Sequence, residues 1–201
     1  MSGAGHGLGG RLDLADRVTL DDAGRKLFDD ITANAVAWAR RCGFAAATAD
    51  GHLIGPFNPS LLNPGLSAAF LKLQAAEMQY TSLDERTRQV VILTVGSVWR
   101  APYELYAHSA AASRAGLPES LIAALAAGEE PDALTDGQRT AHRLARALST
   151  GHHVDDALYD EAVQRFGTAG VFDITVLAGT YHTVCGILNA FAIPAPDHHE
   201  H

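Results

Sequence analysis

Apolar residues recur at spacings of three and four through most of this chain, and no segment alternates apolar and polar residues as a half-buried strand does. Leu27, Ile31 and Ala35, for example, fall on one face of a helix over residues 21–42, and Leu20 just before it continues that face. Helix-start and helix-stop residues divide this pattern into segments of ordinary helix length. The sequence therefore predicts an all-α fold.

Caps and prolines mark the ends of the predicted helices. Asn63-Pro64 is a typical helix start, with Asn as the cap and Pro in the first turn. Ser82-Leu83-Asp84-Glu85 and Thr135-Asp136-Gly137-Gln138 both have the capping-box pattern. Pro102 does not fit inside a continuous helix, so residues 99–101 should form a break. The predicted helices cover about residues 21–42, 63–80, 82–98, 102–116, 117–128, 135–150, 154–167 and 169–191.

The length of 201 residues favours a single domain. We expect a disordered tail over residues 1–18, because the Gly-rich start lacks the apolar centre of a signal peptide. Residues 19–195 should form one all-helical domain, and residues 196–201, which contain three histidines, a flexible tail. These features predict a cytoplasmic protein.

Residues 169–191 are the most apolar stretch of the chain, and a membrane span is the alternative to a buried helix there. Asp173, His182 and Asn189 within this stretch favour a buried central helix. Residues 44–62 form the longest predicted loop, which contains several glycines and prolines but also large apolar residues. Such a loop either packs over the core or contributes to a functional site, and the sequence does not decide between the two.

The formal net charge is −8, which disfavours nucleic acid or an anionic membrane surface as a partner. Cys42 and Cys185 are far apart and form no Cys-x-x-Cys pattern, so we expect two buried free thiols, with a disulfide as the alternative. No ligand spacing for a metal is present, and we predict neither metal nor cofactor. His142 is expected to be exposed and His182 to lie in the core.

Glu104 and His108 stand four residues apart in the predicted helix 102–116, so they share one face and can touch. A carboxylate beside an imidazole raises its proton affinity and can fix its tautomer, which suits general acid or base chemistry near neutral pH. The same spacing also occurs on solvated helices, where it has no catalytic meaning.

Five short motifs, taken in this order, resemble those of the carboxymuconolactone decarboxylase family, over roughly residues 50–195. The motifs are Gly55-Pro56-Phe57-Asn58-Pro59, Leu83-Asp84-Glu85-Arg86-Thr87-Arg88, Tyr103-Glu104-x-x-x-His108, Ala115-Gly116-Leu117 and Leu188-Asn189-Ala190-Phe191. The resemblance implies an alkyl hydroperoxidase D-like helical fold. It also implies a homo-oligomer, such as a trimer or hexamer, with the site in a helix-lined pocket near a subunit interface.

The chain departs from the peroxidase branch of this superfamily. That branch has a Cys-x-x-Cys pair, with a His four residues after the second Cys and a Glu twelve residues before the first. The corresponding positions here are Ala101 and Glu104 for the cysteines and Gln89 for the glutamate. A thiol peroxidase mechanism is disfavoured, because the chain lacks both the attacking and the resolving thiolate there.

The resemblance implies a cofactor-independent carboxy-lyase that decarboxylates a small carboxylated lactone or related acid from aromatic-compound breakdown. His108 is the candidate general acid or base and Glu104 its orienting partner, although Glu104 could equally be the acid. The same pair could run an isomerisation or a lactone hydrolysis. A third reading is a non-catalytic helical oligomer that binds a small molecule.

To bind a small anionic ring compound, the protein needs a positively charged side chain for the carboxylate and flat side chains that pack against the ring. Arg100, just before the pair, is the first candidate cation. Arg86 and Arg88 are further candidates, with surface or subunit-interface salt bridges as the alternative. Trp99 and Tyr103 could line a pocket for a flat ligand, and Tyr181 could stand opposite His108.

Overall fold

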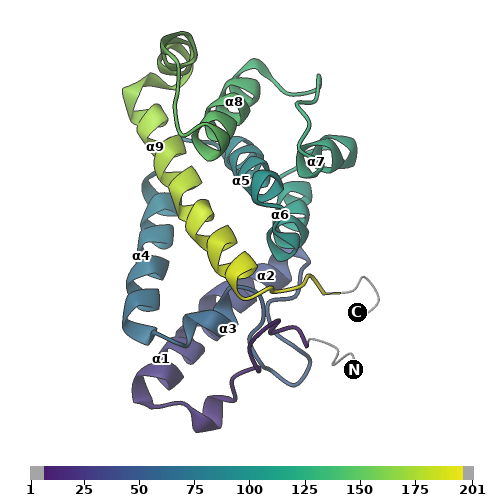
Figure 1. Ribbon diagram of the computed structural model, residues 1–201, viewed down its shortest axis with the longest axis vertical. Helices are drawn as coiled ribbons and strands as arrows, with labels where there is room; N and C mark the ends of the chain where they lie inside the picture. Colours follow the sequence, from purple (N-terminus) through teal and green to yellow (C-terminus); the bar gives the residue numbers. More distant parts are fainter. Residues whose placement is uncertain (1–6, 197–201) are drawn as a thin grey trace.

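The structure is a computed structural model that describes residues 7–196, and that part of the chain is all-helical, as expected (Figure 1). Its β-structure consists of one isolated bridge between Ala47 and Leu53. The elements are η1 (Arg17–Thr19), α1 (Asp22–Ile31), the π-helical η2 (Thr32–Val36), α2 (Ala37–Cys42), α3 (Phe57–Ser60), α4 (Pro64–Tyr80), α5 (Glu85–Trp99), α6 (Pro102–Arg114), α7 (Glu119–Ala126), α8 (Asp136–Thr150) and α9 (Asp156–Ala190).

Helix α5 is the centre of the bundle, packed against α6, α7, α8 and α9. Every residue from Thr87 to Gly96 is buried, so the helix has no solvent-facing side over that length. A helix buried all round is normally apolar all round. Arg88 and Gln89 break that rule, and burying two polar side chains there requires partners inside the protein.

The break predicted at residues 99–101 is confirmed. Arg100 adopts a left-handed conformation with φ 50°, and Pro102 begins α6 in its first turn. The reversal folds α6 back along α5. The two helices approach closely at Gly96, where a Cβ atom would lie 3.1 Å from Leu105 Cδ2 and 3.3 Å from Glu104 Cγ.

Helix α9 is bent at Gly167, whose φ of 67° and ψ of 172° are not helical, so the predicted division into two helices at this glycine is confirmed. By length and composition α9 could cross a membrane, a test that core helices of soluble proteins also pass. Its C-terminal part crosses the bundle and packs on α5 and α8 (Figure 1). The expected helix is therefore present and packed on the bundle, but it is buried on one face only, with Phe172 67% exposed, and the central buried helix is α5.

The loop over residues 44–62 packs on α6. The hydroxyl of Tyr103 donates to the Ala45 carbonyl oxygen at 2.7 Å, and the Ala45 amide donates to the Tyr106 hydroxyl at 2.9 Å. Gly55, with φ 65°, lies against the Tyr103 ring, where a Cβ atom would be 2.2 Å from Cζ. Five apolar side chains of the loop are buried in the core: Phe44, Ala46, Leu53, Ile54 and Leu61.

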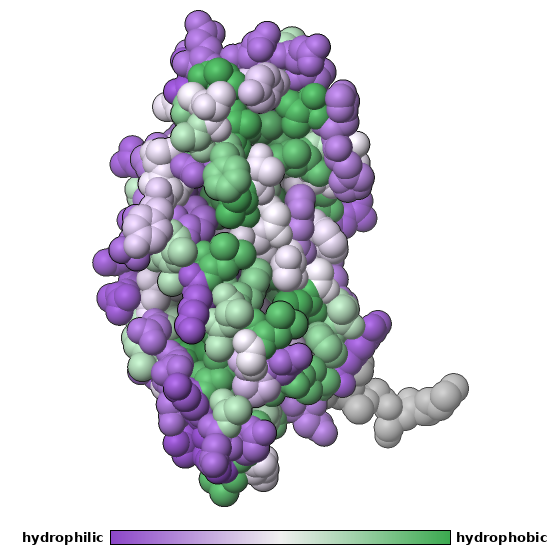
Figure 2. Space-filling model, turned by 90° about the vertical axis from the view of Figure 1, so that its left-hand side faces the viewer, coloured by the Kyte–Doolittle hydropathy of each residue, from purple (hydrophilic) through white to green (hydrophobic). Residues whose placement is uncertain are grey.

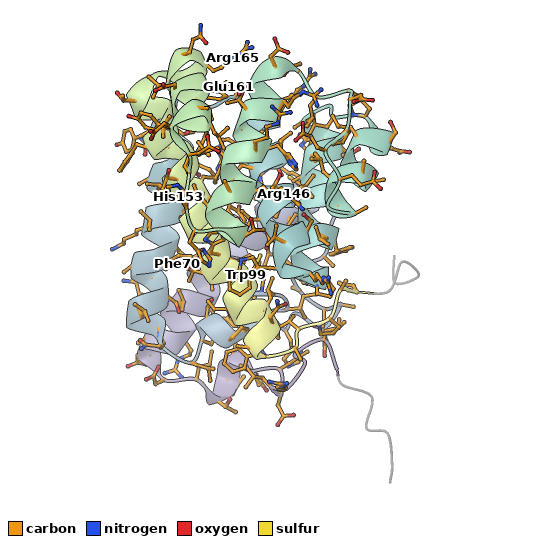
Figure 3. All side chains as sticks on the ribbon, turned by 45° about the horizontal axis from the view of Figure 1, so that its top comes forward. Phe70, Trp99, Arg146, His153, Glu161 and Arg165 are labelled. Atoms are coloured by element: carbon orange, nitrogen blue, oxygen red, sulfur yellow. The ribbon has the colours of Figure 1, made fainter. Side chains whose placement is uncertain are left out.

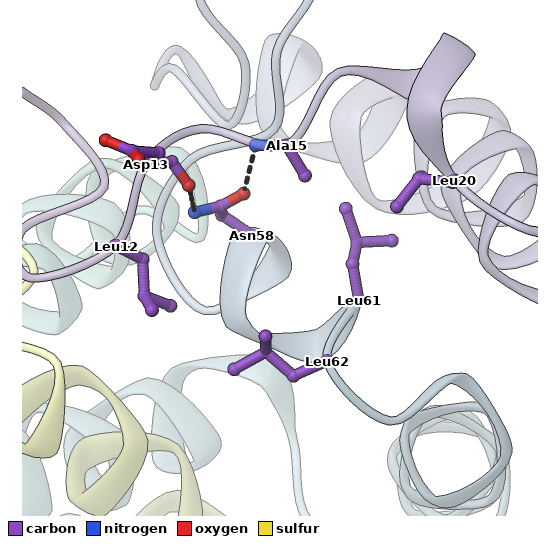
Figure 4. Close-up of a pocket in the computed structure, with 7 residues that line it drawn as sticks. All are labelled: Leu12, Asp13, Ala15, Leu20, Asn58, Leu61 and Leu62. Atoms are coloured by element: carbon purple, nitrogen blue, oxygen red, sulfur yellow. Dashed lines mark hydrogen bonds between the residues drawn. The ribbon is translucent and has the colours of Figure 1, made fainter.

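The expected disordered tail over residues 1–18 is too long, because the segment from residue 7 is packed on the protein. The Arg11 amide donates to the Phe191 carbonyl at 2.7 Å. Asn58 of α3 accepts from the Ala15 amide and donates to the Asp13 carbonyl (Figure 4). These contacts border a pocket of about 110 Å³, lined by Leu12, Asp13, Ala15, Leu20, Asn58, Leu61 and Leu62. Residues 1–6 and 197–201 lie outside the described residues, so the tails expected there stay predictions.

One of the two predicted capping boxes is confirmed. Thr135 and Gln138 cap each other's backbone amides at the start of α8. Ser82 does not cap α5, because its hydroxyl and amide are both bonded to Asp173 of α9. Asp84 takes its place and accepts from the Thr87 amide at 3.0 Å.

Helix α4 covers one side of the bundle, and most of its own surface is open: no whole residue of it is buried, although the side chain of Glu77 is only 5% exposed. Leu66 is 68% exposed, and Leu73 and Met78 are also exposed. Phe172 of α9 is 67% exposed as well. Figure 2 shows this side of the molecule, with apolar residues gathered over a broad area. Exposed apolar surface of this extent is typical of an interaction site.

A buried glutamate and histidine pair as a candidate active site

Glu104 and His108 meet inside the bundle, one turn apart on α6. His108 Nε2 lies 3.2 Å from Glu104 Oε1, and the two side chains are 7% and 3% exposed. The contact predicted from their spacing is therefore present, and the pair is in the protein interior. This separates it from the many such pairs that lie on solvated helices.

Glu104 Oε1 has no hydrogen-bond partner, although it lies 3.2 Å from His108 Nε2. Leaving a buried polar atom unsatisfied costs about 1–3 kcal/mol. Few such atoms occur in native proteins, and each calls for an explanation, of which a catalytic role is one. Oε1 is thus an unsatisfied acceptor in the protein interior.

Burial favours the neutral forms of both members of the pair. It raises the pKa of Glu104 to about 8. Burial, and then the charge of Arg88, lowers the pKa of His108 to about 3. The sequence predicted the reverse for the imidazole, a proton affinity raised by a neighbouring carboxylate. That prediction is wrong, because no solvent stabilises the charged forms of either group here.

Gln89 of α5 occupies the other side of the imidazole, with its Oε1 2.9 Å from His108 Nδ1. It is 1% exposed, and its amide nitrogen donates to Glu85 Oε1 at 2.7 Å. In the sequence this position was notable only for lacking a carboxylate. The available signal was that Gln89 falls four residues after Glu85, but which helix it would face could not be predicted.

Aromatic rings from two other helices surround the imidazole. Tyr181 of α9 meets His108 edge to face, with ring centroids 5.0 Å apart. Trp38 of α2 lies 6.0 Å away at 45°. Tyr181 thus lies against the His108 ring, and its predicted role in substrate binding stays a prediction; Trp38 was not foreseen. Together they give the pair flat apolar neighbours.

Arg88 of α5 is a buried cation one residue before Gln89, and two glutamates already balance its positive charge. It pairs with Glu77 of α4 through a two-point contact and with Glu85 at 3.0 Å. Arg88 and Glu77 are both nearly inaccessible to solvent. The cluster ties α4 to α5 beside the pair.

Three of the predicted substrate-binding residues do not join the pair. Arg100 is exposed at the turn between α5 and α6. Trp99 is 37% exposed at the end of α5, where its ring packs near His182 of α9 (Figure 3). The break at residues 99–101 carries both side chains to the surface. Tyr103 is buried, but its hydroxyl holds the loop at Ala45.

The two cysteines are free thiols, as expected; Cys185 is buried and Cys42 is half-buried. Burial raises the pKa of both thiols, and the charge of Glu104 adds to the effect at Cys185. Raised values disfavour the thiolate, which is the reactive form. The environment of both residues therefore agrees with the case against thiol peroxidase chemistry.

Two other histidines within residues 7–196 have structural partners on one ring nitrogen. His142 is buried and not exposed as predicted, with Nδ1 2.8 Å from the Thr94 hydroxyl. His182 is half-buried and its Nε2 lies 2.8 Å from the Ser149 hydroxyl. Among residues 7–196, no group of three or more His, Cys, Asp or Glu side chains is placed to hold a metal ion.

Residues 64–147 match the sequence model of the Carboxymuconolactone decarboxylase family. The resemblance seen in the motifs is confirmed over this segment, which includes both members of the pair. Nothing matches among the curated proteins.

Solved structures share the fold. An uncharacterised peroxidase-related protein from Silicibacter sp. TM1040 is 18% identical, with a TM-score of 0.75 over 99% of this chain and 98% of that one. The alkylhydroperoxidase AhpD core protein from Ralstonia eutropha JMP134 is 14% identical, with a TM-score of 0.72 over 93% and 92%. The debrominase Bmp8, in complex with 2,3,4-tribromopyrrole, is 17% identical, with a TM-score of 0.68 over 92% and 95%. At these identities the similarity establishes the alkyl hydroperoxidase D-like fold.

Proposed function

We propose that this chain, which carries a carboxymuconolactone decarboxylase family segment over residues 64–147, is a carboxy-lyase for a small carboxylated lactone or related acid, acting in the cytoplasm. Glu104 and His108 would move the proton, and the reaction needs neither metal nor cofactor. The observation that supports this is the buried contact between the two side chains, in which Glu104 Oε1 has no other partner.

The decarboxylation requires that one proton be added to one carbon of the lactone. When the bond to the carboxylate breaks, carbon dioxide leaves and its electron pair is delocalised into the unsaturated lactone. A carbon of the lactone must then take up a proton, and a protonated Glu104 can supply it. Glu104 becomes a carboxylate in that step and regains its proton from solvent or product before the next turnover.

The interior position of the pair also favours the bond-breaking step. A carboxylate brought from water into a site of low polarity loses its hydration, and losing carbon dioxide removes that charge. Arg88 is committed to Glu77 and Glu85, so it does not hold the substrate carboxylate as a free cation would. Arg100 has no part in this proposal. Tyr181 and Trp38 would pack against the ring of the guest.

The test is turnover of a panel of carboxylated lactones, followed as carbon dioxide release. His108→Gln should lower turnover by about 10²–10⁴-fold if the imidazole takes part in proton transfer. His153→Gln, at an exposed position on the loop before α9, is the matched control and should leave turnover unchanged. Unchanged turnover in His108→Gln rejects the role. No turnover by the intact protein favours the reading as a non-catalytic small-molecule-binding oligomer.

We also propose that a second copy of the chain covers the apolar face of α4, which gives the expected homo-oligomer, a trimer or hexamer. In the single chain α4 packs on the bundle through one side, with Phe70 and Leu71 only partly buried, while Leu66 and Leu73 on it stay exposed. Most helical stability in proteins comes from packing, so covering these residues would stabilise the helix. Leu66→Glu and Leu73→Glu place charges on that face. Light scattering after size exclusion should show a smaller species for the double variant, and an unchanged mass would contradict the proposal.

A further inference from the structure

Gln89 is held in one orientation by Glu85. The Glu85 side chain accepts from the Gln89 amide nitrogen at 2.7 Å through Oε1 and pairs with Arg88 through Oε2. A carboxylate in an ion pair is an acceptor only. The NH₂ group of Gln89 must therefore point toward Glu85, and the amide oxygen must point the other way.

The amide oxygen of Gln89 in turn determines which nitrogen of His108 carries hydrogen. Oε1 lies 2.9 Å from His108 Nδ1, and an amide oxygen can only accept. Nδ1 must therefore be the N–H. In a neutral imidazole the other nitrogen, Nε2, is then bare, and it is the one that faces Glu104 Oε1 at 3.2 Å.

We infer that Gln89 is a positioning residue that fixes the Nδ1–H tautomer of His108, leaves Nε2 as a base, and so makes Glu104 the proton donor of the pair. The assignment of a donor rests on the proposed function. The tautomer rests on the hydrogen bonds alone, and it is a property of the resting protein.

The surroundings agree with one proton on Glu104 and one on His108 Nδ1. Burial, which shifts both pKa values toward the neutral forms, leaves a protonated carboxyl beside a neutral imidazole at pH 7. The charged and titratable groups that act on the pair are Tyr103 of α6, Arg88 of α5, and Tyr181 and Cys185 of α9, and Arg88 is itself paired with Glu77 of α4 and Glu85 of α5. Arg88 is offset by its two glutamates, and burial holds Tyr181 and Cys185 in their neutral forms.

This arrangement gives the two members of the pair different roles toward a guest that loses carbon dioxide. Glu104 gives the one proton that the carbon of the guest takes up, and the bare Nε2 of His108 has no proton to donate in its place. The step leaves Glu104 as a carboxylate beside a neutral imidazole whose Nδ1–H is still bonded to Gln89. Glu104 takes its next proton from solvent, so the net reaction consumes one proton and releases carbon dioxide.

The tautomer can be read directly by ¹⁵N NMR of protein labelled at the histidine ring nitrogens, with His108 assigned from its loss in His108→Gln. The intact protein at pH 7 should show His108 as the Nδ1–H tautomer. An Nε2–H tautomer or an imidazolium would overturn the inference. In addition, infrared spectra should contain a protonated carboxyl band that Glu104→Gln removes, and a band unaffected by that change would overturn the assignment of the donor.

Gln89→Met keeps the size of the side chain and removes the amide acceptor. We expect the Nε2–H tautomer to appear in this variant, and a spectrum that stays entirely Nδ1–H would show that Gln89 does not fix the ring. Gln164→Met, at an exposed position on α9, is the control and should leave the His108 signals unchanged. Gln89→Glu restores an acceptor at the same place and should restore Nδ1–H, with a larger imidazolium fraction.

The two hypotheses fail separately. A protein that decarboxylates nothing but shows the Nδ1–H tautomer, lost in Gln89→Met, disproves the proposed function and keeps the role of Gln89. A protein that turns over a lactone with His108 in the Nε2–H tautomer keeps the function and disproves the role of Gln89.

Discussion

Gly96 of α5 lies against the side chain of Glu104 on α6, so closely that a methyl group on Gly96 would stand 3.3 Å from Glu104 Cγ. The same methyl group would lie 3.1 Å from Leu105 Cδ2. The absence of a side chain at Gly96 therefore sets how far Glu104 reaches into the bundle. This contact links the packing of two helices to the position of the candidate acid.

Gly96→Ala should consequently disturb both the fold and the site. We expect a loss of about 1–3 kcal/mol in the free energy of unfolding, typical of overpacking, measured by urea denaturation. Gly179→Ala on α9 is the matched control, since nothing lies within 4 Å of its added methyl group. That variant should gain about 0.5–1 kcal/mol from helix propensity. Equal effects of the two changes would show that the contact at Gly96 is not tight.

The pair should also give stability a particular dependence on pH. Glu104 has its pKa raised from 4.5 to about 8, so the folded protein holds an extra proton in this range and stability falls as pH rises through it. His108 has its pKa lowered from 6.5 to about 3, so stability falls as pH drops from 6.5 to 3. Between 4.5 and 6.5 the two effects oppose each other, which leaves a plateau.

The difference between variants isolates this effect from the other groups of the protein. In Glu104→Gln the loss of stability between pH 6.5 and 8 should shrink, because the side chain no longer titrates. Glu119→Gln, at an exposed position at the start of α7, should behave like the unmodified protein. Urea midpoints measured across the pH range check this, and parallel curves for Glu104→Gln and the unmodified protein would contradict the raised pKa.

Tyr103 should matter for stability and not for chemistry. Tyr103→Phe removes the 2.7 Å hydrogen bond to the Ala45 carbonyl, and we expect it to cost about 0.5–1.5 kcal/mol in the free energy of unfolding. Tyr80→Phe, where the ring is exposed, is the control and should cost nothing measurable. Turnover should be unchanged in both variants. A loss of turnover in Tyr103→Phe without a loss of stability would indicate that Tyr103 does contact the substrate.

Arg100 offers a simple check on the revised view of substrate binding. Because this arginine lies at the surface turn after α5, Arg100→Ala should change neither kcat nor KM by more than a small factor. Arg114→Ala, an exposed position at the end of α6, is a control for the loss of one positive charge. A large rise in KM confined to Arg100→Ala would show that the substrate carboxylate does reach it.

Much of the fold could be predicted from local patterns. Asn63-Pro64, Pro102, Thr135-x-x-Gln138 and Gly167 act through their own backbone or the next turn, so their effects are visible in the sequence. Ser82 was misread because its hydroxyl is taken by Asp173, which is 91 residues away. The packed segment from residue 7 was missed for a similar reason, since Phe191 and Asn58 hold it.

In the candidate site, too, contacts within one helical turn could be predicted from the sequence, and contacts between helices could not. Glu104 and His108 are one helical turn apart, so their contact followed from spacing. Gln89, Trp38 and the burial that reverses the expected protonation depend on how α2, α5 and α9 pack around α6, which no spacing encodes. Arg100 and Trp99 were assigned by nearness in sequence, and the left-handed turn at Arg100 separates them from the pair.

The most direct measurement is kcat for carbon dioxide release from a carboxylated lactone by the intact protein and by Glu104→Gln, which keeps the shape of the side chain and removes its transferable proton. Proton transfer by Glu104 predicts a fall of about 10²–10⁴-fold, with Glu119→Gln as active as the unmodified protein. If Glu104→Gln releases carbon dioxide at the unmodified rate, the buried pair is not what performs the reaction.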